Sequence, residues 1–164
     1  MNKVIVLIVF VALLTLPVMA ADKPKAEVFG GYQYTRLGGD FGGINANGWN
    51  AAVNGNVNKW FGVTGDFSGT YKDGVHVYTY MFGPTISMRG NRFTPFVHAL
   101  FGGFRATGAG STNGLAVAVG GGADAKIVPH VAIRLGQFDW VMLHDNGITE
   151  KSNVRLSSGV VFRF

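Results

Sequence analysis

The chain has 164 residues, of which 14% are charged and 13% aromatic, with 25 glycines and no cysteine. Soluble domains usually carry about 25% charged residues, so an ordinary secreted globular domain is disfavoured, and a disulfide-stabilised one is excluded. The formal net charge of +5 is only weak evidence for binding to nucleic acid. We therefore expect no nucleic-acid partner.

The first segment has the layout of a secretory signal peptide. Lys3 precedes a continuous apolar run from Val4 to Leu16, and the segment Pro17–Ala20 ends in a small residue. The alternative, a permanent membrane helix, needs about 20 apolar residues, but here a proline and then polar residues interrupt the run. We therefore predict a cleaved signal peptide at residues 1–20 and one exported domain at residues 21–164.

Alternation of two kinds of side chain begins near Ala26 and predicts β-strands, whose successive side chains point to opposite faces. The first predicted strand spans residues 26–35, and a loop rich in Gly and Asn is predicted at Leu37–Asn47. In the second strand, residues 49–58, one face carries a row of asparagines. Asparagine is costly in an apolar core unless hydrogen-bonded, so we expect this face to line a polar interior.

Short turns connect the next strands. A turn near Lys59 leads to a strand at residues 61–71, and an Asp-Gly hairpin at Lys72–Gly74 leads to a strand at residues 75–89. Pro84 cannot donate a ladder hydrogen bond, so we predict a bulge or a missing bond there.

The fifth predicted strand, residues 94–105, has two apolar faces. We predict that its even-numbered apolar residues face outward because they are bulkier, which sends Arg105 inward and His98 outward. That outward set is Phe96, Leu100 and Phe104.

A loop at Ala106–Asn113 precedes the sixth strand, residues 115–127, whose three consecutive glycines would let the backbone bend as barrel closure requires. After a turn at Val128–His130, strict alternation in the seventh strand would place Asp139 on the apolar face. An extra residue at Gly136 and Gln137 restores the pattern, which predicts a β-bulge.

The last strand, residues 153–164, follows a loop predicted at Met142–Ser152. Eight strands joined alternately by short turns and longer loops are typical of a small outer-membrane barrel. The predicted fold is therefore all-β, an eight-stranded antiparallel up-and-down transmembrane β-barrel. Closure of the barrel gives the backbone groups at every strand edge a hydrogen-bonding partner. This is necessary in lipid, because no water is present to bond them.

Charged residues recur at positions predicted to face the interior. An eight-stranded barrel is just wide enough for its side chains to fill it, so we predict a polar network that plugs the lumen. The predicted members are Glu27, Asp66, Arg89, Asp124, Lys126, Arg134, Asp139 and Arg155. The alternative is a narrow porin-like channel for ions or small solutes.

Aromatic residues recur near the strand ends. High strand propensity alone could explain them, but we favour the interfacial girdles of a membrane barrel. The predicted girdle residues are Trp49, Tyr71 and Trp140 at the outer rim and Trp60 and Phe164 at the inner rim.

We predict no catalytic, cofactor or metal site, because the four histidines are too scattered for metal ligation. A lipid A deacylase would need a His-x-Ser pair, which none of these histidines provides. A lipid A palmitoyltransferase uses His, Asp and Ser at the outer end. His144, Asp145 and Ser152 share a predicted loop, and we interpret them as solvated loop residues.

Four stretches begin at Phe29 (Phe-Gly-Gly-Tyr-Gln-Tyr), Tyr80 (Tyr-Met-Phe-Gly-Pro), Pro95 (Pro-Phe-Val-His-Ala-Leu-Phe-Gly-Gly) and Val154 (Val-Arg-Leu-Ser-Ser-Gly-Val-Val-Phe-Arg-Phe). Together they resemble the small outer-membrane β-barrel family related to the transmembrane domain of outer membrane protein A. The resemblance implies that the terminal strand carries a signal for the outer-membrane assembly machinery. Its residues here are Val160, Phe162 and Phe164.

The sequence thus favours a monomeric protein in the outer membrane of a Gram-negative-type bacterium, in contact with lipid and with a structural or surface-interaction role. A channel remains the first alternative. The second is a periplasmic lipocalin-like carrier, whose apolar face would line a cavity. In that case four polar residues would face outside water, namely Asn50, Asn54, Asn56 and Asp66.

Overall fold

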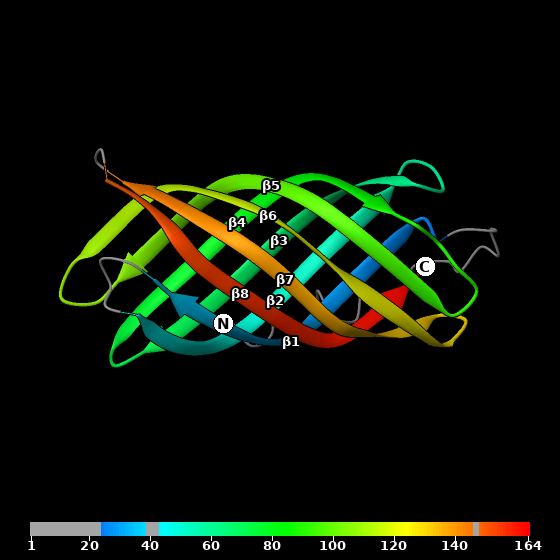
Figure 1. Cartoon of the computed structure of the whole chain (residues 1–164), viewed down its shortest axis with the longest axis horizontal. Helices are drawn as coiled ribbons and strands as arrows, with labels where there is room; N and C mark the ends of the chain where they lie inside the picture. Colours follow the sequence, from blue (N-terminus) through cyan, green and yellow to red (C-terminus); the bar gives the residue numbers. More distant parts are fainter. Residues whose placement is uncertain (1–23, 39–42, 146–147) are drawn as a thin grey trace, which may run out of the picture.

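The structure is a computed structural model that describes residues 24–38, 43–145 and 148–164, so the predicted signal peptide lies outside the described residues. Eight antiparallel strands wind obliquely around one long axis and close into a barrel (Figure 1). They are β1 (Ala26–Leu37), β2 (Ile44–Asn56), β3 (Phe61–Lys72), β4 (Val75–Ser87), β5 (Phe93–Thr107), β6 (Ser111–Val128), β7 (Val131–Asp145) and β8 (Ile148–Arg163). Consecutive strands pair with each other, and β8 closes on β1. The predicted fold is confirmed. In the described ranges there is no helix long and apolar enough to cross a membrane.

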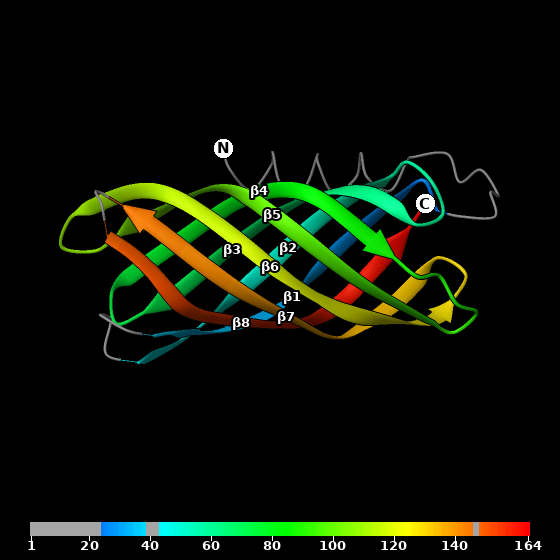
Figure 2. The same cartoon turned by 45° about the horizontal axis from the view of Figure 1, so that its top comes forward.

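The barrel has two distinct ends, which Figures 1 and 2 show at the left and right of the view. The left end, called the loop end here, carries the β1–β2, β3–β4, β5–β6 and β7–β8 connections. The right end, called the terminal end, carries Phe164 and the other three turns. At the β3–β4 hairpin Asp73 and Gly74 both have positive φ, 46° and 82°. This is the backbone that an Asp-Gly hairpin turn requires.

The strands extend further toward the loop end than we predicted. Leu37 pairs with Ile44, Thr107 with Ser111, and Asp145 with Ile148. The predicted extents of the loops at residues 37–47, 106–113 and 142–152 are therefore wrong. Gly and Asn have low strand propensity, but pairing with a neighbouring strand overrides that weak preference.

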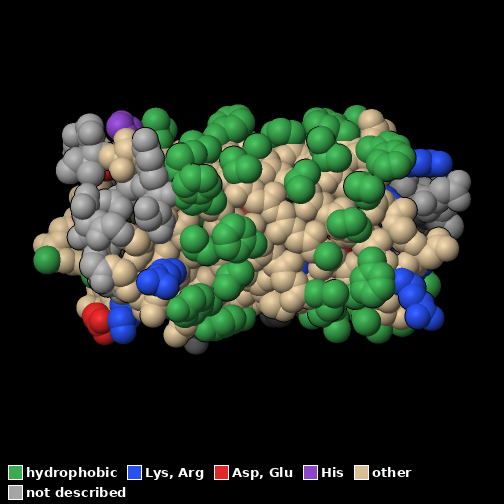
Figure 3. Space-filling view, in the orientation of Figure 1, with side chains coloured by type: hydrophobic (Ala, Val, Ile, Leu, Met, Phe, Trp, Pro, Cys, Tyr) green, Lys and Arg blue, Asp and Glu red, His purple; other side chains and the backbone are tan. Residues whose placement is uncertain are grey.

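Side chains alternate between the lumen and the exterior as predicted for seven of the strands. In β3, for example, Thr64, Asp66 and Ser68 are buried in the lumen, whereas Val63 and Phe67 are exposed on the outside. Figure 3 shows apolar side chains spread over the middle of the outer surface, with charged side chains near the two ends. The lipocalin-like alternative is excluded, because Asn50 and Asp66 point into the barrel and are 1% exposed.

The predicted orientation of β5 is wrong. Leu100 is 1% exposed inside the barrel, whereas Val97 on the other face is 58% exposed. The even-numbered set packs inward because each large residue lies opposite a small one on β6. These cross-strand pairs are Phe96 with Gly122, Leu100 with Ala118, and Phe104 with Gly114. His98 is consequently buried and Arg105 exposed, the reverse of the prediction.

Two predicted irregularities are confirmed. The register between β7 and β8 shifts between Arg134 and Gln137, which is the predicted bulge, and it sends Gln137 and Asp139 into the lumen. At Pro84 the β4–β5 ladder skips the pairs between Phe82 and Thr85 without changing register. A proline has no amide hydrogen to donate, so a missing bond is the expected outcome.

Candidate functional site

Arg155 on β8 ties opposite walls of the barrel together. Its Nη1 donates to Asp66 Oδ1 on β3 at 2.7 Å, and its Nε donates to Asp139 Oδ2 on β7 at 2.8 Å. Asp139 is the direct neighbour of Arg155 in the β7–β8 ladder, whereas β3 is three strands from β8 around the ring of eight, so the bond to Asp66 crosses the lumen. All three side chains are almost completely buried. Each buried charge therefore has an oppositely charged partner in a region that water hardly reaches.

A second group of charges lies nearer the terminal end. Glu27 accepts two bonds from the Arg89 guanidinium, at 3.1 and 2.9 Å, and forms an ion pair with Arg163 at 2.8 Å. Arg163 is also 3.5 Å from Asp124, which accepts a 2.8 Å bond from Arg134 Nε. One carboxylate and one arginine therefore alternate around this section of the lumen.

Gln137 joins the two groups. Its Oε1 accepts a bond from Arg134 at 2.6 Å, and its Nε2 donates to Asp139 at 2.7 Å. The Arg134 guanidinium lies between two aromatic rings, 4.2 Å from the centre of Phe29 and 4.3 Å from that of Phe96. Cation–π contact holds this cation in place. We call the whole set the charged layer, namely Glu27, Asp66, Arg89, His98, Asp124, Arg134, Gln137, Asp139, Arg155 and Arg163.

The structure brings together most residues that the sequence suggested for the lumen. Glu27, Asp66, Arg89, Asp124, Arg134, Asp139 and Arg155 all lie in the charged layer. Lys126 does not. Its cross-strand partner is lumen-facing Ala132, but Lys126 lies near the terminal end of β6, where its side chain is exposed.

Three members of the charged layer, Gln137, Arg163 and His98, are not among the predicted network residues, and His98 is the one predicted to face outward. Its Nε2 is 2.7 Å from Asp139 Oδ1, and both side chains are buried. The wrong orientation of β5 hid this contact. The signal that could have found it is the run Gly120–Gly122 on β6, whose lack of side chains leaves space for large inward residues on β5.

Little open space remains beside the charged layer. A cavity of about 30 Å³ lies among Glu27, Asp66, His98 and Asp124, and another of the same size lies among Gln33, Ser68, Asn153 and Arg155. A cavity needs about 10–15 Å³ of such volume to hold one water molecule. Each cavity therefore has room for about two water molecules and is too small for a larger solute.

The aromatic residues singled out in the sequence all lie on the outside. Trp49 Nε1 donates to Tyr71 Oη at 2.9 Å, and the Trp49 ring covers Gly69 on the neighbouring strand. Trp60 lies in the β2–β3 turn at the terminal end, and Trp140 lies on β7. Phe164 closes the barrel through its backbone, which exchanges hydrogen bonds with Ala26. Val160 and Phe162 are exposed beside β1.

The residues compared with a palmitoyltransferase are only partly described. His144 Nδ1 is 2.7 Å from Thr149 Oγ1, and the side chain of Ser152 lies outside the described residues. Among the residues that the structure describes, no three His, Asp or Glu side chains are grouped to hold a metal ion.

Similar folds occur among solved structures. Neisserial surface protein A (NspA) matches with a TM-score of 0.70 and 14% identity, over 88% of this chain and 100% of that one. The N-terminal barrel domain of OprF from Pseudomonas aeruginosa matches with a TM-score of 0.67 and 13% identity, over 87% and 100%. Ail, the attachment invasion locus protein of Yersinia pestis, matches with a TM-score of 0.57 and 17% identity, over 87% and 99%.

No protein-family model and no curated protein matches the sequence. At identities this low, the structural matches establish the fold. The chain therefore has the fold of the small eight-stranded outer-membrane β-barrels.

Proposed function

We propose that the protein is an integral outer-membrane β-barrel of a Gram-negative-type bacterium, closed to solutes, with a structural or surface-interaction role. The observation that carries this proposal is the placement of polarity: charged side chains fill the inside and apolar side chains cover the outside. Such a barrel is stable when lipid surrounds it, because lipid solvates the apolar exterior and strand closure satisfies the backbone.

The proposal also assigns the two ends of the barrel. The connections are short at both ends, two to six residues at the loop end and two to five at the terminal end, so their lengths do not set the direction. In this proposal the terminal end lies on the periplasmic side and the loop end faces outward. Trp49 and Tyr71 toward the loop end, and Trp60 at the terminal end, would serve as the aromatic girdles, whereas Trp140 lies directly opposite Val119 of β6 and would be nearer the middle of the membrane. In this proposal residues 1–20 are removed on export, residues 21–164 form the monomeric barrel, and no cofactor or catalytic step is involved.

The closed lumen predicts that the protein does not conduct ions across a membrane. Protein refolded into a planar bilayer should show no conductance steps above the leak of the bilayer, because Arg155 and its two carboxylates block the lumen. A large porin inserted under the same conditions is the positive control. Reproducible steps whose size depends on the salt used would favour the channel alternative instead.

The last strand makes a second prediction, about assembly. Replacing Phe164 by serine should lower the amount of folded barrel in the outer membrane of living cells, since we propose that Val160, Phe162 and Phe164 are read by the assembly machinery. The refolded variant should lose little stability, because Phe164 closes the barrel through backbone bonds that serine keeps.

The two measurements are the amount of folded protein in outer-membrane fractions and the free energy of unfolding after refolding. Replacing exposed Phe93, at the start of β5, by serine is the matched control, because it removes the same ring outside the last strand. Equal effects of F164S on assembly and on stability would contradict the assembly role.

A further inference from the structure

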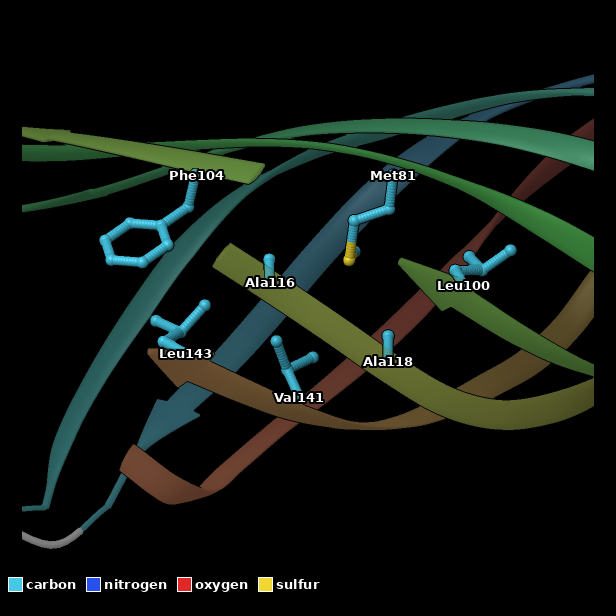
Figure 4. Packing of buried hydrophobic residues seen from close by; sticks show 7 residues of the cluster. All are labelled: Met81, Leu100, Phe104, Ala116, Ala118, Val141 and Leu143. Carbon is cyan, nitrogen blue, oxygen red and sulfur yellow. The ribbon is translucent and has the colours of Figure 1, made fainter. Parts of the chain in front are cut away.

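The lumen changes from charged to apolar toward the loop end. Figure 4 shows seven buried side chains gathered inside the barrel on β4 to β7, namely Met81, Leu100, Phe104, Ala116, Ala118, Val141 and Leu143. The interiors of membrane barrels are usually polar. Lipid contact does not explain these residues, because they face away from it.

Beyond this cluster, at the loop end, lies a cavity of about 180 Å³. Its walls are almost entirely apolar, and six residues form most of them: Leu37, Ala46, Val77, Phe104, Ala106 and Leu143. An apolar protein cavity of about 150 Å³ holds one benzene molecule. We call this cavity the outer mouth of the barrel. Its volume and apolar walls suit one molecule that contains a single aromatic ring.

The floor of the outer mouth offers hydrogen bonds. The smaller cavity above Arg155 shares Leu37, Thr70, Val77 and Leu143 with the outer mouth, so the two spaces adjoin. Its walls include Gln33 and Asn153, each 1% exposed. Within the described residues, the Gln33 Oε1 acceptor and the Asn153 Nδ2 donor have no partner. Buried polar groups normally have one, so a polar group on a bound molecule would find both a donor and an acceptor here.

Charge and depth restrict the occupant further. Among the described residues, the charges on the wall of the outer mouth are Lys72 and Asp73, which form an ion pair with each other at 3.3 Å, so this pair favours neither sign of ligand charge. Met81 and Arg155 fill the lumen beneath, and both are nearly fully buried. A long acyl chain would have to displace them.

We propose that the outer mouth binds one small, neutral molecule with an apolar body of about one aromatic ring and a single hydrogen-bonding group. Binding is driven by transfer of the ring from water to the apolar walls, and the polar group points toward Gln33 and Asn153. The site goes beyond the proposed function and rests on it only for the side of the membrane from which the molecule enters.

Benzyl alcohol is the test molecule, and methyl NMR of the protein in phosphatidylcholine nanodiscs is the readout. Methyl signals of Leu37, Val77 and Leu143 should shift to a plateau as benzyl alcohol is added. Signals of lipid-facing Val117 and Val119 should shift in proportion to its concentration, because they report only partition into lipid. Benzoate, which has the same ring but a negative charge, should produce no plateau.

Two variants fill the cavity from different walls, V77F from β4 and A46L from β2. Each should abolish the plateau, whereas V119F makes the valine-to-phenylalanine change on the lipid face and should preserve it. A dispersed amide spectrum shows which variants fold, and either filling variant alone decides the question.

Proportional shifts at the outer-mouth methyls, an equal response to benzoate, or a plateau that survives in a folded filling variant would overturn the site. None of these results bears on conductance, so failure of the site and failure of the proposed function can be told apart.

Discussion

Replacing Arg155 by methionine should lower the free energy of unfolding of the refolded barrel by about 3–5 kcal/mol, the usual cost of removing one partner from a buried ion pair. Methionine has a volume similar to that of arginine. The decrease in unfolding free energy therefore reflects the loss of the charge and not the creation of a cavity. Asp66 and Asp139 would be left buried without the cation that both contact. Denaturant unfolding in lipid vesicles, extrapolated linearly to water, measures the change.

The matched control is K72M, which removes the cation of the exposed Lys72–Asp73 pair. Exposed ion pairs contribute about 0–1 kcal/mol, so the control should lose no more than that. Adding D66N to R155M should recover part of the loss, because the mutation removes one of the two uncompensated charges. Similar losses for R155M and K72M would show that the charged layer does not hold the barrel together.

Replacing Val119 by arginine should cost about 2–4 kcal/mol in lipid vesicles, the range measured for a cation at the bilayer midplane on a barrel exterior. Val119 lies in the middle of β6, and its side chain is 53% exposed on the outer surface. If lipid surrounds this surface, the guanidinium must lose its hydration. Unfolding free energies of the two proteins in vesicles of one lipid composition provide the measurement.

Leu115 provides the depth control, since it lies on the same face of β6 but nearer the loop end. L115R should cost less than V119R, toward the roughly 0–1 kcal/mol seen near the membrane interface. A barrel whose exterior faces water would tolerate both arginines to within about 0.5 kcal/mol, as exposed surface positions generally do. Equal and small losses would therefore contradict the membrane location.

The sequence by itself determined the strand count, the order of the elements and the face of most residues. The reason is that these features are determined by residues that lie close together in the sequence. Alternation with a period of two, as along residues 153–163, directly reports two different environments on the two faces of a strand. The Asp73–Gly74 turn and the bulge before Gln137 were predictable for the same reason, because turn residues and a break in alternation lie within a few positions of their effect.

Only the tertiary structure decided which face of β5 is inside. Both faces are apolar, so local pattern carries no information, and the outcome depends on cross-strand volume: Phe104 fits inward because Gly114 lies opposite. That orientation brings His98 to Asp139 and forms the apolar outer mouth. The strand ends were likewise set by pairing between strands. These are relations between residues distant in the chain, which no single stretch of sequence specifies.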